Sequence, residues 1–167
     1  EKLTAREFLE FVGDLYQVPK TILNRRIESF LSLFDLKKRE NDLLEGYSRG
    51  MKQKVCLSAT LIHDPEIIFL DEPTANLDPV SARIVKDIIL DLSRKANKTL
   101  FICTHLLEIA KELCDVIGII NKGVLVIEGT PNAVIQSVSA SSLEEAYLKI
   151  LNPSQNEGQK KDYLSWR

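Results

Sequence analysis

The chain has 167 residues, of which 44% are apolar and 28% charged, and its formal net charge is −2. This composition is typical of a soluble globular protein with one ordinary domain or two small lobes. The near-neutral charge disfavours nucleic acid as a main partner. A membrane-spanning helix needs roughly twenty consecutive apolar residues. The apolar runs here are far shorter, so we expect neither a span nor a signal peptide.

Residues 1–63 are predicted to be all helical. Thr4 and Glu7 have the spacing of a capping box, which starts a helix that continues to about Tyr16. Pro19 suits the first turn of a second helix, because its missing N–H is not needed there. That helix carries apolar residues at helical spacing on one face. They are Leu23, Ile27, Phe30, Leu31 and Phe34.

A third helix is predicted over residues 49–62. The polar and charged run Lys37–Asp42 before it is interpreted as a solvated connection. Ser48 is a good N-cap for the helix. Asp64 precedes a proline and therefore ends it. His63 is interpreted as a helix-end residue near the last carbonyl groups.

Residues 64–152 have a different character, with short apolar runs alternating with amphipathic segments. The runs predict strands buried on both faces, as in a parallel α/β core. We expect strands at Glu66–Leu70, Thr99–Cys103 and Val116–Ile120, and a hairpin partner at Val124–Glu128. Helices are expected after Asp78, from about Leu106, after Thr130, and from a second capping box at Ser142–Glu145. Residues 153–167 are polar and are predicted to form a loose tail.

Three cysteines lie in apolar segments, and none is paired at metal-ligand spacing. We therefore expect Cys56, Cys103 and Cys114 to be small buried hydrophobic residues in a reducing compartment.

Two adjacent acids, Asp71 and Glu72, end the first predicted strand. Strands direct alternate side chains to opposite faces, so the two carboxylates are suited to different tasks. Ligands of open α/β sheets bind at the carboxyl ends of strands. A carboxylate there can hold Mg²⁺, usually through water, and its neighbour can polarise a water that attacks a phosphoryl group.

The segment Tyr47–Gln53 begins about twenty residues before that strand. Ser48 supplies a hydroxyl, Gly50 allows close approach of the backbone, and the helix start directs free amides and a positive dipole at an anion. Arg49 either adds charge beside a phosphate or faces solvent. By itself this segment predicts only the start of a helix. Its spacing of about twenty residues before the strand that ends in Asp71 and Glu72 makes it a candidate functional motif.

The string from Ile67 to Asp78 resembles the Walker B strand and D-loop of an ATP-binding-cassette (ABC) ATPase. Tyr47–Gln53 resembles the signature motif of that family, with Tyr47, Arg49 and Met51 replacing the usual Leu, Gly and Gln. His105, directly after a predicted strand, resembles the switch histidine that contacts the γ-phosphate of ATP.

This resemblance implies a P-loop NTPase (RecA-like) α/β core, here partial, with an all-helical signature subdomain. Residues 1–63 would be that subdomain and residues 64–152 the C-terminal part of the core. It implies water-mediated Mg²⁺ coordination by Asp71, a general-base role for Glu72, and binding of ATP by Ser48, Arg49 and Gly50 in trans. The D-loop that crosses the dimer interface would consist of Ala75, Asn76, Leu77 and Asp78.

None of the seven glycines is followed by Lys, so the sequence contains no Walker A phosphate loop. The family's Gln-bearing loop is not found either. We therefore expect the C-terminal two-thirds of such a domain, with negligible ATPase activity on its own. The absent strand would lie between Thr99–Cys103 and Val116–Ile120. A gap in the sheet there, or oligomerisation that fills it, is expected.

As a member of this family, the intact protein would pair head to tail with a second ATPase subunit and drive a transmembrane permease. It would be cytoplasmic, peripheral on the inner face of the cell membrane. The residues around the motifs resemble the branch that exports drugs, lipids or polysaccharides; the cargo itself is set by the permease. Two alternatives stay open: a shortened, non-catalytic regulatory subunit, and a soluble cassette ATPase of translation or DNA repair.

Overall fold

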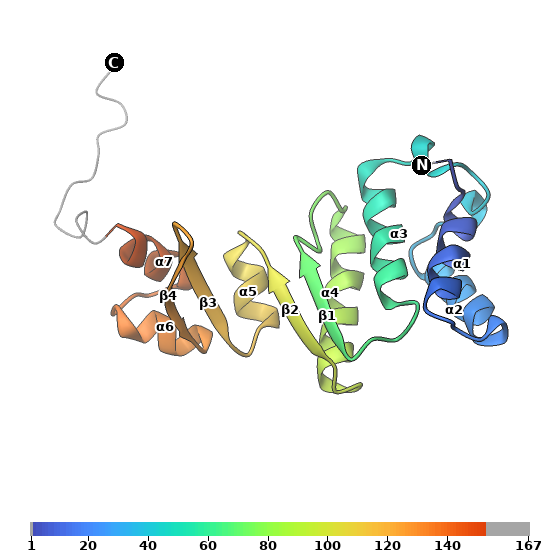
Figure 1. Ribbon diagram of the computed structural model, residues 1–167. Coiled ribbons are helices and arrows are strands. Elements are labelled where there is room, and N and C mark those ends of the chain that lie inside the picture. Colours follow the sequence, from blue (N-terminus) through green and yellow to red (C-terminus); the bar gives the residue numbers. More distant parts are fainter. Residues whose placement is uncertain (1, 153–167) are drawn as a thin grey trace, which may run out of the picture. The chain divides into compact units, whose positions relative to one another are not determined.

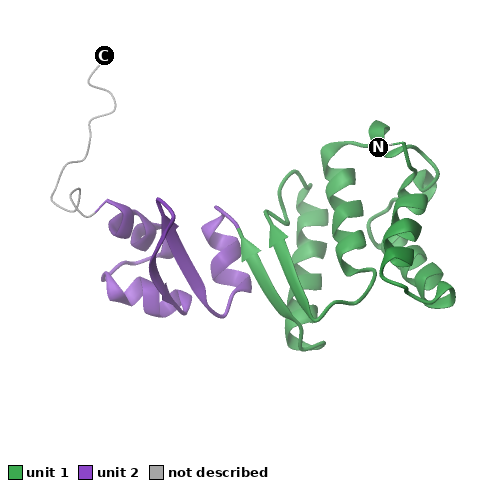
Figure 2. Cartoon of the chain, in the orientation of Figure 1, with its two compact units in different colours: residues 1–103 green, residues 104–167 purple. Residues whose placement is uncertain are grey.

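The computed structural model describes residues 2–152 (Figure 1). The chain divides into two compact units, residues 1–103 and 104–167 (Figure 2), which are described separately. The first unit contains the predicted helical segment together with the Walker B-like strand. The predicted tail, residues 153–167, lies outside the described residues.

Five helical elements begin the first unit. They are α1 (Ala5–Leu15), α2 (Lys20–Leu33), η1 (Lys37–Arg39), η2 (Leu44–Gly46) and α3 (Arg49–Leu61). The first capping box is confirmed, because Thr4 Oγ1 accepts the Glu7 N–H at 3.2 Å and Glu7 Oε2 accepts the Thr4 N–H at 2.8 Å. Pro19 is the N-cap of α2, one position before its predicted place. The core of this region consists of fully buried aliphatic side chains, among them Leu9, Leu23, Ile27, Leu31 and Val55.

The charged run Lys37–Asp42 was predicted to be a solvated connection, and this is wrong for Glu40. Only 16% of the Glu40 side chain is exposed. Its carboxylate accepts from Arg6 Nε at 2.9 Å and pairs with Lys37 Nζ at 3.1 Å. Arg6 and Lys37 also pair with Glu28 of α2. Burial opposes ionisation of Glu40, but the two cations outweigh it and lower the pKa of its carboxyl.

A βαβ element completes the first unit, with β1 (Ile67–Asp71), α4 (Pro79–Arg94) and β2 (Thr99–Cys103). The two strands are parallel, and their register runs from Ile67 opposite Thr99 to Asp71 opposite Cys103. Asp78 caps α4 by accepting the Ser81 N–H at 2.9 Å. The predicted strands and the helix between them are thus confirmed.

Burial of β1 on both faces is not observed. Ile68 is 1% exposed, whereas its neighbour Phe69 is 74% exposed. Phe69 stacks on Phe101 of β2, with ring centroids 5.0 Å apart. Strand side chains alternate between faces, so one face of this sheet packs inward and the other presents apolar side chains to solvent.

The second unit contains α5 (Leu107–Leu113), β3 (Ile117–Asn121), β4 (Val124–Gly129), α6 (Pro131–Ser137) and α7 (Leu143–Leu151). The predicted hairpin is confirmed as the antiparallel pair β3–β4. Ser142 caps α7, but the reciprocal half of the second capping box is replaced. The Glu145 carboxylate accepts the N–H of Ser141 at 2.7 Å instead. The core of this unit consists of Ile117, Ile119, Val134, Leu143 and Ala146.

The strands of the described residues form two separate two-stranded sheets, β1–β2 and β3–β4. Within that part of the chain, β2 is hydrogen-bonded to β1 and β3 to β4. Within residues 2–152, β2 and β3 thus belong to different sheets, and the gap between them stays a prediction.

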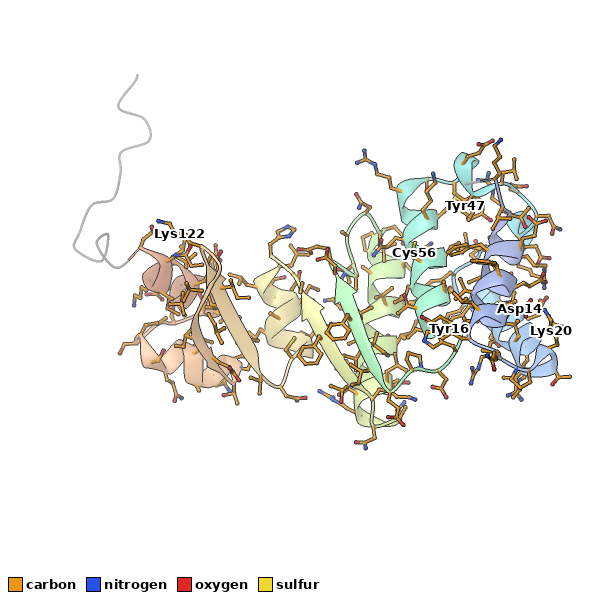
Figure 3. All side chains as sticks on the ribbon, viewed as in Figure 1. Asp14, Tyr16, Lys20, Tyr47, Cys56 and Lys122 are labelled. Atoms are coloured by element: carbon orange, nitrogen blue, oxygen red, sulfur yellow. The ribbon has the colours of Figure 1, made fainter. Side chains whose placement is uncertain are left out.

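The cysteines are less buried than predicted. Cys56 and Cys103 are exposed, and only Cys114 is partly buried, where burial raises the pKa of its thiol. Cys56 lies on α3 (Figure 3). Cys103 shares the uncovered sheet face with Phe101, two residues away.

Candidate active site

The two adjacent acids lie at the carboxyl end of the parallel pair β1–β2. Asp71 is the last residue of β1 and is exposed, while Glu72 follows it and is half-buried. Glu72 has a φ of 45°, in the left-handed region that non-glycine residues seldom adopt. Its N–H donates to the carbonyl of Cys103 at 2.9 Å. The end of β2 therefore fixes the point at which the chain turns away from β1.

The loop from residue 73 to residue 77 leads directly into α4. Pro73 and Thr74 are buried, and the Ala75 N–H donates to the carbonyl of Glu72 at 3.0 Å. Asp78 ends the loop as the N-cap of α4. The hydroxyl and N–H of Ser81 hold the pKa of Asp78 down at about 2. The carboxylate of Asp78 is therefore ionised at neutral pH and is engaged in the cap.

The start of α3 is exposed at Ser48 and Arg49. Ser48 Oγ accepts the Met51 N–H at 3.3 Å, which confirms the predicted N-cap. Tyr47, at the position of the family's Leu, is 5% exposed, and its hydroxyl donates to the Arg39 carbonyl at 2.6 Å. Figure 3 labels Tyr47 at this end of α3. The larger side chain is thus accommodated because its polar tip finds a partner.

The start of α3 also contacts the loop that follows β1. A Cβ built on Gly50 would lie 2.6 Å from the carbonyl oxygen of Asn76. Gln53 Nε2 donates to the carbonyl of Glu72 at 3.4 Å. The structure therefore brings together two motifs that the sequence places about twenty residues apart.

Sequence analysis missed Gln53 as a site residue, and it missed Lys54, whose Nζ lies 3.8 Å from Asp78 Oδ2. The helical spacing of Gln53 and Lys54 from Gly50 could have predicted their contacts with the loop after β1. Residues three and four positions after Gly50 lie on the same helix face as that glycine. A close contact at Gly50 thus predicts contacts at Gln53 and Lys54.

His105 lies in the second unit, two residues after the end of β2, as predicted. It is exposed, in a turn where Thr104 Oγ1 accepts the Leu106 N–H at 3.1 Å. The other predicted site residues all belong to the first unit.

The donor set at Asp71 fits a hard cation held largely through water. Among residues 2–152 no group of three His, Cys, Asp or Glu side chains is placed to hold a metal ion. Mg²⁺ commonly uses one or two carboxylates, with waters and substrate phosphates as its other ligands. An exposed carboxylate at a strand end meets that requirement.

Comparison with known proteins identifies the family. The profile of the family described as ABC transporter matches residues 1–75. The ABC transporter ATP-binding protein NatA of Bacillus subtilis is 33% identical over 151 residues, which are 90% of this chain. The chain belongs to the ABC transporter ATP-binding family. A fluoroquinolones export ATP-binding protein of Mycobacterium tuberculosis is 39% identical over 131 residues, 78% of this chain.

A solved ATP-binding subunit of an ABC transporter gives the same assignment. It is 27% identical, covers 90% of this chain and superimposes with a TM-score of 0.82. A dimeric ATP-binding cassette bound to ADP and Pi, 23% identical, shares the fold with a TM-score of 0.68. The chain thus has the P-loop NTPase fold in part, as expected.

The chain spans 61% of the length of NatA and 42% of the M. tuberculosis protein. None of the helices in the described part is long and apolar enough to span a bilayer.

Proposed function

We propose that the protein containing this chain binds and hydrolyses ATP to drive an export permease. The observation that carries this proposal is the pair Asp71–Glu72 at the end of β1, with the backbone of Glu72 held by β2. A carboxylate beside a cation site is the usual means of orienting and deprotonating a water for phosphoryl transfer. Bound Mg²⁺ would supply neutralisation of phosphate charge.

The residues divide into two groups by the nucleotide that each would serve. Asp71 holds the cation through water, and Glu72 accepts a proton from the attacking water. His105, in the second unit, is assigned to contact with a γ-phosphate. Ser48 and Gly50 present the exposed N-terminus of α3, a positive dipole end, to the ATP of a second subunit. Exposed Arg49 adds a positive charge at that N-terminus.

The proposed partners are a second ATPase subunit and a transmembrane permease. The dimeric cassette bound to ADP and Pi supports the first, with the D-loop, Ala75–Asp78, at the subunit interface. The export proteins among the relatives support the second and favour outward transport. The ATPase would then act peripherally on the inner face of the cell membrane, on a cargo chosen by the permease.

Glu72→Gln in the full-length protein tests the proposal. The amide keeps the size of the side chain but cannot accept the proton, so we expect ATP turnover to fall at least a hundredfold, within the range for loss of a general base. ATP binding should be retained. Glu66→Gln, an exposed acid before the opposite end of β1, is the matched control and should keep wild-type turnover.

Normal turnover in the Glu72→Gln protein contradicts the general-base assignment. A wild-type protein that hydrolyses no ATP by itself, yet stimulates a complete ATPase subunit, supports the regulatory alternative instead. Residues 1–167 alone are expected to show negligible turnover, because they contain no Gly-Lys phosphate loop.

A further inference from the structure

One face of the first two turns of α3 is in contact with the loop that follows β1. Gly50, Gln53 and Lys54 lie on this face, and their partners are Asn76, Glu72 and Asp78 respectively. The contacts differ in kind: a close backbone approach, a hydrogen bond and an ion pair. Together they hold the start of α3 and the loop as one piece.

Glu72, which precedes this loop, has a left-handed backbone conformation, with a φ of 45°. A non-glycine residue in the left-handed region is strained and persists only where its surroundings impose that conformation. Pro73 also disfavours right-handed helical angles at Glu72. The N–H of Glu72 is held by Cys103, and its carbonyl accepts from Ala75 and from Gln53.

Cys103 and Ala75 contribute backbone groups to these contacts, a carbonyl and an N–H, whereas Gln53 contributes a side-chain amide from α3. Its amide is part-buried, so the hydrogen bond is partly shielded from competing water. The orientation of the Glu72 peptide groups sets the direction of its Cα–Cβ bond, from which the side chain with its carboxylate extends.

We propose that Gln53 is a positioning residue for Glu72, and that it couples the start of α3 to the orientation of the general base. The inference rests on the proposed roles of Glu72 and of the α3 N-terminus. A shift of α3 when Ser48 and Gly50 engage the nucleotide of a second subunit is passed through the Gln53 amide to the carbonyl of Glu72. The chain's own hydrolytic step thereby senses occupancy of the neighbouring site.

Gln53→Met and Gln53→Glu in the full-length protein test this. Methionine has nearly the same length but no donor, and glutamate adds an acceptor facing a carbonyl oxygen. A hydrogen bond is worth about 0.5–1.5 kcal/mol net, so we expect kcat to fall about threefold to tenfold in Gln53→Met, and further in Gln53→Glu. The KM for ATP should change less than twofold, because the proposed action of Gln53 is on the orientation of Glu72 and hence on kcat.

The control is Gln136→Met, the same substitution on α6 in the second unit, which should keep wild-type kcat. Thermal unfolding of each variant is measured so that kcat is compared where all are folded. Equal kcat in Gln53→Met, Gln53→Glu and wild type overturns the positioning role, as does a rise in KM with kcat unchanged. If Glu72→Gln still abolishes turnover while the Gln53 variants keep wild-type kcat, the proposed function stands and only the positioning role of Gln53 is wrong. Normal turnover in Glu72→Gln would instead contradict the proposed role of Glu72.

Discussion

Gly50 and Asn76 are in closer contact than any side chain at position 50 would allow. The carbonyl oxygen of Asn76 lies where a Cβ on Gly50 would come within 2.6 Å of it. Real Cβ atoms do not approach a backbone oxygen this closely. The glycine of the signature-like motif is therefore needed within its own chain, in addition to the approach to an anion that the sequence suggests.

Gly50→Ala should consequently destabilise the first unit. The added methyl group has to displace backbone and not a flexible side-chain end, so we expect a loss of about 1–3 kcal/mol, as for overpacking in a core. Urea unfolding followed by circular dichroism measures it. Gly46→Ala is the matched control, because a Cβ there meets nothing within 4 Å and its φ is not positive. Equal stability of the two variants would contradict the contact.

The uncovered face of β1–β2 should make residues 1–167 associate when studied alone. Phe69 is 74% exposed and Phe101 is 56% exposed, and their rings are stacked. Contiguous apolar surface with an adjacent free strand edge favours association at micromolar concentrations. Sedimentation velocity should detect oligomers in wild type and a clear shift towards monomer in Phe69→Ser.

Phe11→Ser is the control for that experiment. Phe11 is also exposed, at 59%, but it lies on α1 and not on the sheet. Its replacement should leave the association unchanged. A monomeric wild-type chain throughout the micromolar range would show that the uncovered face does not drive self-association.

His63 should make the stability of the fold depend on pH. Its ring stacks on Tyr16 of α1 at 3.7 Å, and its Nδ1 is buried without a hydrogen-bond partner. Figure 3 labels Tyr16, the C-cap residue of α1. Burial lowers the pKa of His63 and outweighs a backbone hydrogen bond with Ala59 that raises it; the charge of Arg26 also lowers this pKa, and that of Asp64 raises it. The folded state thus favours the neutral imidazole.

The sign of the effect follows from linkage. Because the folded pKa lies below the unfolded value of about 6.5, the unfolded chain binds the proton more readily. The stabilisation is fully present above about pH 6.5 and is lost as the pH falls towards the folded pKa. Urea midpoints at pH 7.5 and 5.5 should differ more for wild type than for His63→Phe. His105→Phe, at the chain's other histidine, should keep the wild-type difference; a flat wild-type profile would refute the assignment.

Local interactions were predicted well from the sequence. The N-caps Thr4, Ser48, Asp78 and Thr130 and the first capping box depend on hydrogen bonds between residues three positions apart. The strands were found because apolar runs and their breakers are local signals too. The placement of Asp71 and Glu72 at the end of β1 followed from the same reading.

Predictions that depend on distant partners succeeded less often. Both-sided burial of β1 and burial of Cys56 and Cys103 were inferred from apolar neighbours in the sequence, yet exposure depends on what other elements cover. Glu40 was predicted to be exposed to solvent because its neighbours in the sequence are polar. The partner that holds its carboxylate, Arg6, lies 34 positions away in the sequence.

The sequence by itself determined the family, the order of helices and strands, and the acids at the end of β1, because these are properties of short strings of residues. Only the tertiary structure decided that Gly50 abuts Asn76 and that Gln53 holds the carbonyl of Glu72. Those contacts join residues 26 and 19 positions apart. They exist only once α3 has packed beside the loop after β1, and no local pattern encodes the distance between two packed elements.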